Sequence, residues 1–270
     1  MRKFSIIVAA LATLTASSVY AEASSSATGI NFRYTLTDLD PDDGITPSLS
    51  FANAAIYNAS AGAGVQLAGV DNTSVHYGAS TFGPVASNET NAQSSAAAQV
   101  SGDGSLGSAA LHAEGHSTPG PVATSYTATT TVLRPSAAVD PYASFTLSAN
   151  TEVHFMMDVD LKAKSTNFHE LATALAYFDI FDATGRNYHA QLNADLFSMG
   201  NSQVKDLLEI YVGNFTGDAQ TYYANVGVQA IGSVLAPVPE PATYALMLSG
   251  LAFVGWTAGR RLRQAKNAPR

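Results

Sequence analysis

The sequence contains no cysteine and few charged residues. Without cysteine the chain has no disulfide bond, no thiol nucleophile and no cysteine-ligated zinc site. Charged residues make up 13% of the chain, whereas about 25% is usual, so serine, threonine and asparagine must provide much of the polar surface. This composition is typical of β-rich proteins outside the cytoplasm, and the stability of such a chain comes from an ordinary buried core.

Basic residues are scarce between the two ends of the chain. Residues 22–237 contain 6 Lys and Arg against 20 Asp and Glu, a net charge of −14. Such a surface repels phosphate backbones, so we expect no nucleic-acid partner. The sequence also lacks a P-loop, a dinucleotide fingerprint and a Gly-x-Ser-x-Gly elbow. It singles out no catalytic residue and no cofactor, and we expect a protein that is not an enzyme.

The N-terminus has the pattern of a signal peptide, residues 1–21. Two basic residues precede an apolar run at 4–16, and small residues follow at the two sites that signal peptidase inspects. We place the cleavage between Ala21 and Glu22. The apolar run is too short to serve as a membrane span in the mature protein.

The C-terminus combines an apolar run with a basic tail. Residues 242–259 carry no charge and as a helix would be roughly 27 Å long, which is just enough to cross a membrane. The tail at 260–270 begins with Arg260, Arg261 and Arg263, and positive charge beside a span stays in the cytoplasm. The sequence therefore predicts a transmembrane helix with the body of the chain outside. A buried core helix is the alternative.

Pro239, Glu240 and Pro241 precede this apolar run. Two prolines around one residue disfavour helix and hold the backbone extended, which suits a processing enzyme. The motif, the span and the terminal arginines closely resemble the PEP-CTERM sorting signal, from Val238 to the C-terminus. The resemblance implies processing by exosortase, a membrane protease, after a transient stay in the inner membrane. It also implies an association with exopolysaccharide at the cell surface or in the medium. An ordinary single-pass anchor is the alternative.

The body, residues 22–237, has the period-two pattern of antiparallel β-structure. Apolar and polar residues alternate at 151–163 and 188–196, and the Asp182–Gly185 step predicts a hairpin turn. Further strands are expected at 30–36, 48–57, 75–82, 125–133, 208–212 and 222–231. The region 96–115 fits either a thin strand pair or a long loop. We expect one all-β sandwich with jelly-roll-like or Greek-key connections.

Two motifs invite a metal-binding interpretation. Asp38, Asp40 and Asp42 alternate as at the start of an EF-hand, but Leu49 stands where a bidentate glutamate is required. They leave only a weak calcium candidate, with a solvated acidic turn as the alternative. His112-Ala-Glu-Gly-His116 has the wrong spacing for a zinc-binding helix. We therefore assign no metal site.

Three functions remain open for the body. The first is a non-catalytic component of the cell surface or the extracellular biofilm matrix. The second is a carbohydrate-binding module, for which four tyrosines offer a stacking platform: Tyr188, Tyr211, Tyr222 and Tyr223. The third is an envelope enzyme acting on glycans, because carboxylates are numerous enough to include a glycosidase-type pair, although nothing in the sequence singles one pair out.

The signal-peptide pattern gives a direct prediction. The exported protein should begin at Glu22, because the small residue at Ala21 is the one that signal peptidase accepts. N-terminal sequencing of material from outside the cytoplasm measures this. A first residue of Met1 would contradict the interpretation.

Overall fold

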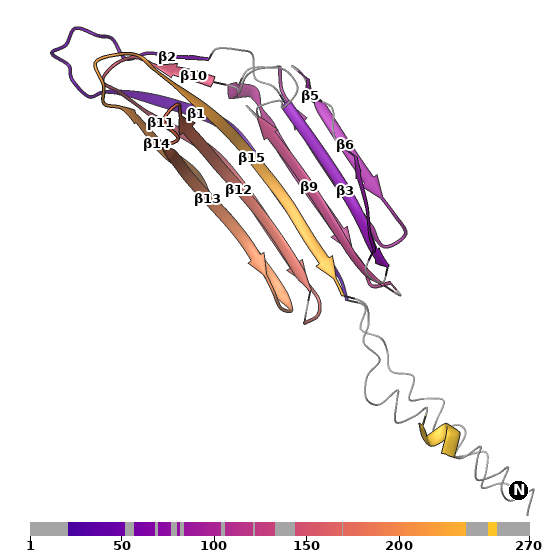
Figure 1. Cartoon of the computed structure of the whole chain (residues 1–270). Coiled ribbons are helices and arrows are strands. Elements are labelled where there is room, and N and C mark those ends of the chain that lie inside the picture. Colours follow the sequence, from indigo (N-terminus) through magenta and orange to yellow (C-terminus); the bar gives the residue numbers. More distant parts are fainter. Residues whose placement is uncertain are drawn as a thin grey trace, which may run out of the picture. The chain divides into compact units, whose positions relative to one another are not determined.

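Strands account for most of the described residues in the computed structural model (Figure 1). The structure describes residues 21–51, 57–67, 70–76, 80–81, 84–103, 106–120, 122–132, 144–168, 170–235 and 248–252. One sheet contains β1 (Ala23–Asp38), β6 (Val85–Thr90), β7 (Ser94–Ser101), β8 (Ala110–Ser117), β11 (Thr151–Ser165) and β14 (Gly200–Asn214). The larger sheet contains β2 (Leu49–Phe51), β3 (Tyr57–Leu67), β4 (Val70–His76), β5 (Ser80–Thr81), β9 (Ala123–Val132), β10 (Ser144–Leu147), β12 (Leu171–Asp182), β13 (Asn187–Leu196) and β15 (Gln220–Val234). A 3-10 turn, η1 (Leu106–Ser108), precedes β8.

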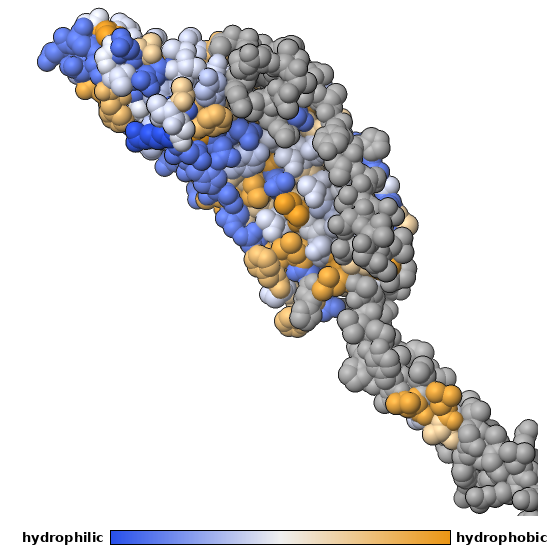
Figure 2. All heavy atoms as spheres, viewed as in Figure 1, coloured by the Kyte–Doolittle hydropathy of each residue, from blue (hydrophilic) through white to orange (hydrophobic). Residues whose placement is uncertain are grey.

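The two sheets pack face to face as a sandwich. The six-stranded sheet has the order β14–β11–β1–β8–β7–β6, and the larger sheet has the order β13–β12–β15–β9–β3–β4. Along β11 every second residue is buried, and β12 and β15 bury alternate residues in the same way. These buried rows meet in one hydrophobic core. Residues on the other face of β13 are exposed and mostly polar (Figure 2). The predicted all-β sandwich and the strands at 151–163 and 188–196 are confirmed.

The predicted turn between β12 and β13 is also confirmed. Gly185 has a φ of 86°, a conformation that favours glycine. The Asp182 carboxylate accepts hydrogen bonds from the backbone N–H groups of Thr184 and Arg186, at 2.9 and 3.0 Å. The region 96–115, which the sequence left open, is a strand pair made of β7 and β8.

A β-bulge in β1 turns an aromatic side chain into the core. Asn31 has a φ of 55°, and the register of β1 against β11 shifts at this point. The Asn31 amide and the Arg33 guanidinium both donate to Asp158, at 2.9 and 3.1 Å. The hydrogen bond from Asn31 makes the largest contribution to lowering the pKa of Asp158, and the hydrogen bond from Arg33 adds to it. The extra residue shifts the alternation of inward and outward side chains along β1 by one position, so that Phe32 is buried.

Aromatic rings fill the core around β10. Phe145 stacks on Tyr222 with 5.3 Å between ring centroids, and it meets Phe155 edge to face at the same distance. Phe32 lies 5.6 Å from Phe155. The Tyr222 hydroxyl donates to the carbonyl of Gly213 at 3.1 Å, and burial raises its pKa to about 12. The phenol therefore stays protonated and keeps its hydrogen bond.

Small residues let the sheets approach closely around Tyr126 of β9. A Cβ atom on Gly115 of β8 would lie 1.9 Å from the Tyr126 ring, and one on Gly232 would lie 2.4 Å from it. The Tyr126 hydroxyl is 2.9 Å from Ser25 Oγ of β1, which is paired with Gly115. Burial raises the pKa of Tyr126, and the Ser25 hydrogen bond offsets only part of this. Tyr126 thus joins the two sheets by packing and by a buried hydrogen bond.

The chain divides into two units between Leu235 and Ala236. The strand pairings and the core of the described residues all lie within 21–235, so we expect residues 22–237 to fold without either end. In the second unit the structure describes residues 248–252, which are helical. Among the described residues, no helix has both the length and the apolar character to cross a membrane. Most of the predicted span at 242–259 lies outside the described residues, as do 1–20, 239–241 and 260–270.

The contact between Gly115 and Tyr126 predicts the effect of a single methyl group. The Gly115→Ala change should lower the free energy of unfolding by about 1–3 kcal/mol, because the added methyl group would overlap the buried Tyr126 ring. Gly217→Ala is the matched control, since no atom lies within 4 Å of the added Cβ. Urea unfolding of residues 22–237 measures both variants. Equal stability of the two variants would show that Tyr126 is not tightly packed.

Candidate functional site

Two rows of mostly polar side chains cross the outer face of the six-stranded sheet. Strand register places them side by side, although they come from distant parts of the sequence. The first row is Asn201, Lys164, Ser24, His116, Ser95 and Thr90, and the second is Gln203, Lys162, Ser26, Glu114, Ala97 and Asn88. Side chains on one face of neighbouring strands are in mutual reach. The rows therefore form one continuous surface from β14 to β6.

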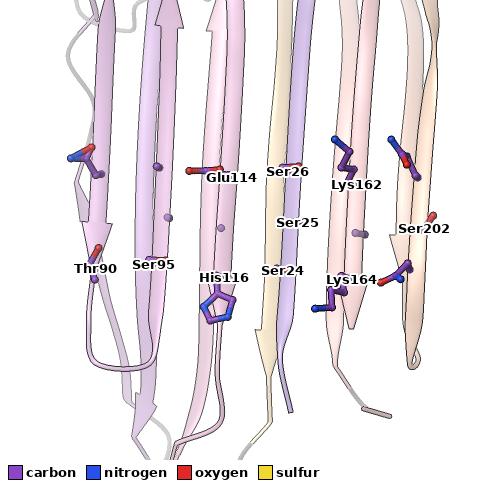
Figure 3. A pocket seen from close by; sticks show the side chains of 17 residues that line it. Ser24, Ser25, Ser26, Thr90, Ser95, Glu114, His116, Lys162, Lys164 and Ser202 are labelled. Carbon is purple, nitrogen blue, oxygen red and sulfur yellow. The ribbon is translucent and has the colours of Figure 1, made fainter. Parts of the chain in front are cut away.

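This surface is hollowed into an open groove of about 700 Å³ (Figure 3). Small residues on β1 and β7 make its low parts, among them Ser24, Ser26 and Ala97. Longer side chains rise from the strands on either side of β1, including Glu114 on β8 and Lys162 on β11. Six strands spaced about 4.8 Å apart give the groove a length of roughly 24 Å. Such a length suits an extended chain better than a single small molecule.

Each lysine of the groove already has an acidic neighbour. Lys162 Nζ lies 3.1 Å from Asp160, and Lys164 Nζ lies 4.0 Å from Glu22. His116 Nε2 is 3.3 Å from the same Glu22 carboxylate. Positive charge is therefore balanced locally, and a ligand carboxylate or phosphate finds no unpaired cation among these side chains.

Asp160 remains ionised beside this groove. Its partial desolvation raises its pKa, but hydrogen bonds from Gln203 and Lys162 and the charges of Lys162 and Lys205 outweigh that effect. The net result is a lowered pKa. The Asp160–Lys162 pair therefore persists at neutral pH.

The lining consists of hydroxyl, amide and charged side chains, with alanine and glycine as its apolar members. Its described lining contains no Phe, Tyr or Trp ring and no large aliphatic side chain. Protein interfaces depend on buried aromatic or aliphatic anchors, which this groove does not offer. Hydroxyls and amides can both donate and accept, as do the hydroxyls of a sugar. The lining thus matches a polyhydroxylated chain.

The acidic turn after β1 does not gather its carboxylates around a common point. Asp38 accepts the backbone N–H of Asp40 at 3.0 Å. Asp43 accepts from Ile45 N–H at 2.6 Å and from the Asn150 amide at 2.8 Å. In the described part of the chain, no three His, Asp or Glu side chains form a group able to hold a metal ion. The structure thus gives the calcium candidate at Asp38, Asp40 and Asp42 no support.

The histidines of the His112–His116 motif lie on β8, a strand, rather than on a helix. His112, Glu114 and His116 therefore face the same side, and His112 Nε2 lies 3.2 Å from Glu114. The motif is a part of the polar outer face of the sheet.

The four tyrosines do not form one platform. Tyr222 is buried in the core, and Tyr188 packs edge to face against it. Tyr223 stacks on Phe181 in the larger sheet, at 5.3 Å. Tyr211 is exposed on the six-stranded sheet, where it stacks on His154 at 3.9 Å. The prediction that the four tyrosines form one stacking surface is therefore wrong. Successive residues of a strand point to opposite faces of the sheet, so neighbouring tyrosines are separated.

The predicted signal-peptide cleavage site, between Ala21 and Glu22, lies directly before β1. Ala21 packs against the core, the Glu22 carbonyl accepts the N–H of Thr166 at 3.1 Å, and β1 begins at Ala23. Strand β1 thus begins one residue after Glu22, the predicted first residue of the mature protein.

Comparison with known proteins identifies the C-terminal end. Residues 237–264 match the family model of the PEP-CTERM protein-sorting motif. The match contains Pro239, Glu240 and Pro241, and it extends through Arg260, Arg261 and Arg263. No curated protein and no solved structure matches the chain significantly. The resemblance seen in the sequence is confirmed for this segment.

Proposed function

We propose, from the PEP-CTERM sorting signal that the chain carries, a non-catalytic protein of the exopolysaccharide matrix. The motif at 237–264 identifies an exported protein that exosortase sorts. The proposal also covers the steps by which the protein is processed and the place where it ends. Signal peptidase removes residues 1–21, the apolar segment holds the body outside the inner membrane, and exosortase cuts near 239–241. The released sandwich then acts at the cell surface or in the medium.

The groove on the six-stranded sheet supports a role as a carbohydrate-binding module within that matrix. Its hydroxyl and amide lining suits a polysaccharide, and its length suits several sugar rings in sequence. Its lysines are paired with Asp160 and Glu22, and the body has a net charge of −14. Both features favour a neutral polysaccharide over an acidic one. Its described lining holds no Tyr, Trp or Phe ring on which a sugar could stack, which means modest affinity at each groove.

The same groove favours binding over hydrolysis. Glycosidases use two carboxyl groups on opposite sides of the scissile bond. The lining contributes one carboxylate, Glu114. The nearby carboxylates of Glu22 and Asp160 contact the groove cations instead. An envelope enzyme acting on glycans is therefore the less favoured function.

Tail processing can be followed through the only tryptophan of the chain, Trp256, which belongs to the apolar segment. After a cut near 239–241 the released protein should lose its tryptophan emission and keep that of its tyrosines. The reason for the cut is the extended, proline-flanked segment beside a membrane span. The measurement is the emission spectrum and intact mass of the surface or medium form from a host with a working exosortase. A released form that retains Trp256 would identify a permanent anchor.

The groove predicts which polysaccharides bind. Residues 22–237 should bind at least one of mannohexaose, cellohexaose and xylohexaose in calorimetric titration, and polymannuronate more weakly. Asn88 and Asn201 stand on opposite rims of the groove. Replacing both with alanine should weaken binding about tenfold, because each amide contributes roughly one hydrogen bond to the sugar.

The control removes two amides from the larger sheet, Asn187→Ala with Gln191→Ala on exposed positions of β13. This variant should bind like the parent protein. Loss of affinity in the control equal to that in the rim variant would exclude the groove as the site. Failure of all three neutral hexasaccharides to bind would refute the carbohydrate role and leave the sorting proposal unaffected.

A further inference from the structure

Four large apolar side chains are exposed at one end of the sandwich. They are Phe168, Phe197, Met199 and Leu235, with 63%, 72%, 60% and 56% of their surfaces accessible. Together they form what we call the apolar end. Exposed side chains of this size normally carry a cost in solubility, and a cluster of them marks a contact surface.

Strand register places these four residues at the same end. Phe168 lies between β11 and β12, and Ser165, which ends β11, is paired with Gly200 at the start of β14. Phe197 and Met199 form the connection that leads into Gly200. At the start of β12, Leu171 is paired with Ser233 of β15, two residues before Leu235. Figure 2 shows apolar residues at the corresponding ends of β12 and β13.

Both ends of the mature body leave from this end of the sandwich. Ala23, the first residue of β1, is paired with Ser165. The chain continues from Leu235 toward the apolar run at 242–259, only a few residues away. Before signal peptidase acts, the exported chain is thus attached to the membrane at two points, both at the apolar end. After that cleavage the C-terminal span alone holds the body, also at the apolar end.

We propose that the apolar end rests on the lipid surface of the inner membrane until exosortase releases the protein. This inference rests on the membrane-anchored stage of the proposed function. Phenylalanine, methionine and leucine bury their side chains at the boundary of headgroups and acyl chains. The short linker keeps the end at a high effective concentration near the bilayer, so a weak contact suffices. After the cut the tether is lost, and the acidic body is repelled by anionic lipids.

The absence of cysteine makes a clean experiment possible. Single-cysteine variants of the full-length chain, Phe197→Cys and Phe215→Cys, are labelled with the environment-sensitive fluorophore NBD. Both positions are highly exposed, but Phe215 follows Asn214, which is paired with Thr151 at the opposite end of β11. The two labels are separated by the length of β14, roughly 50 Å. The labelled chains are reconstituted into vesicles of phosphatidylethanolamine and phosphatidylglycerol.

The proposal predicts blue-shifted emission from the label at position 197 and its quenching by lipids that carry a doxyl group. The label at position 215 should report water and escape quenching. A triple variant, Phe168→Ser, Met199→Ser and Leu235→Ser, should lose the blue shift at position 197 while retaining its β-type circular dichroism. Emission typical of water at both positions would overturn the proposal.

Two further outcomes would also overturn it. A blue shift that disappears when vesicles hold one chain each would identify a second copy of the protein as the occupant of the apolar end. A chain that does not float with the vesicles would contradict the membrane span itself. Flotation without a shift contradicts the lipid contact alone, so the two failures are distinguishable.

Discussion

The insertion of Tyr126 between the two sheets is the contact on which the rest of the sandwich depends. Its ring occupies the space that Gly115 and Gly232 leave free, and its hydroxyl is 2.9 Å from the buried Ser25 Oγ. Ser25 and Gly115 are a cross-strand pair of β1 and β8. Their neighbours Ser24, Ser26, Glu114 and His116 face outward as lining of the groove. The packing inside thus positions the strands whose outer faces form the candidate site.

The groove and the apolar end lie close together, since Ser24 is beside the start of β1 and Asn201 beside the start of β14. On our account this end faces the membrane before exosortase acts. Release would then free the apolar end from the bilayer, and the groove would meet polysaccharide at the cell surface or in the medium. A groove without stacking aromatic rings and with balanced charges gives weak binding. Weak binding by each groove suits a polymer that many copies of the protein contact at once.

The sequence predicted the parts of the fold in which large apolar residues alternate with polar ones. Strand β11 and the turn at Asp182–Gly185 are examples, as is the sorting signal, whose elements are contiguous. It missed the beginning of β1, because alanine and serine at 23–28 give no contrast in hydropathy. The groove was also missed, since its residues meet only through the pairing of β14, β11, β1 and β8. The pattern of one strand predicts which of its side chains face outward, but it does not identify the partner strands that bring those side chains together.

The central claim, that the groove binds a neutral polysaccharide, can be tested by mapping the contact on isotope-labelled residues 22–237. Amide chemical shifts are recorded by NMR as a neutral hexasaccharide that binds the protein is added. We predict that the shifted amides concentrate at Ser24–Ser26, Glu114–His116 and Lys162–Lys164. Shifts centred instead on β13, or on the Tyr211–His154 stack, would contradict the account.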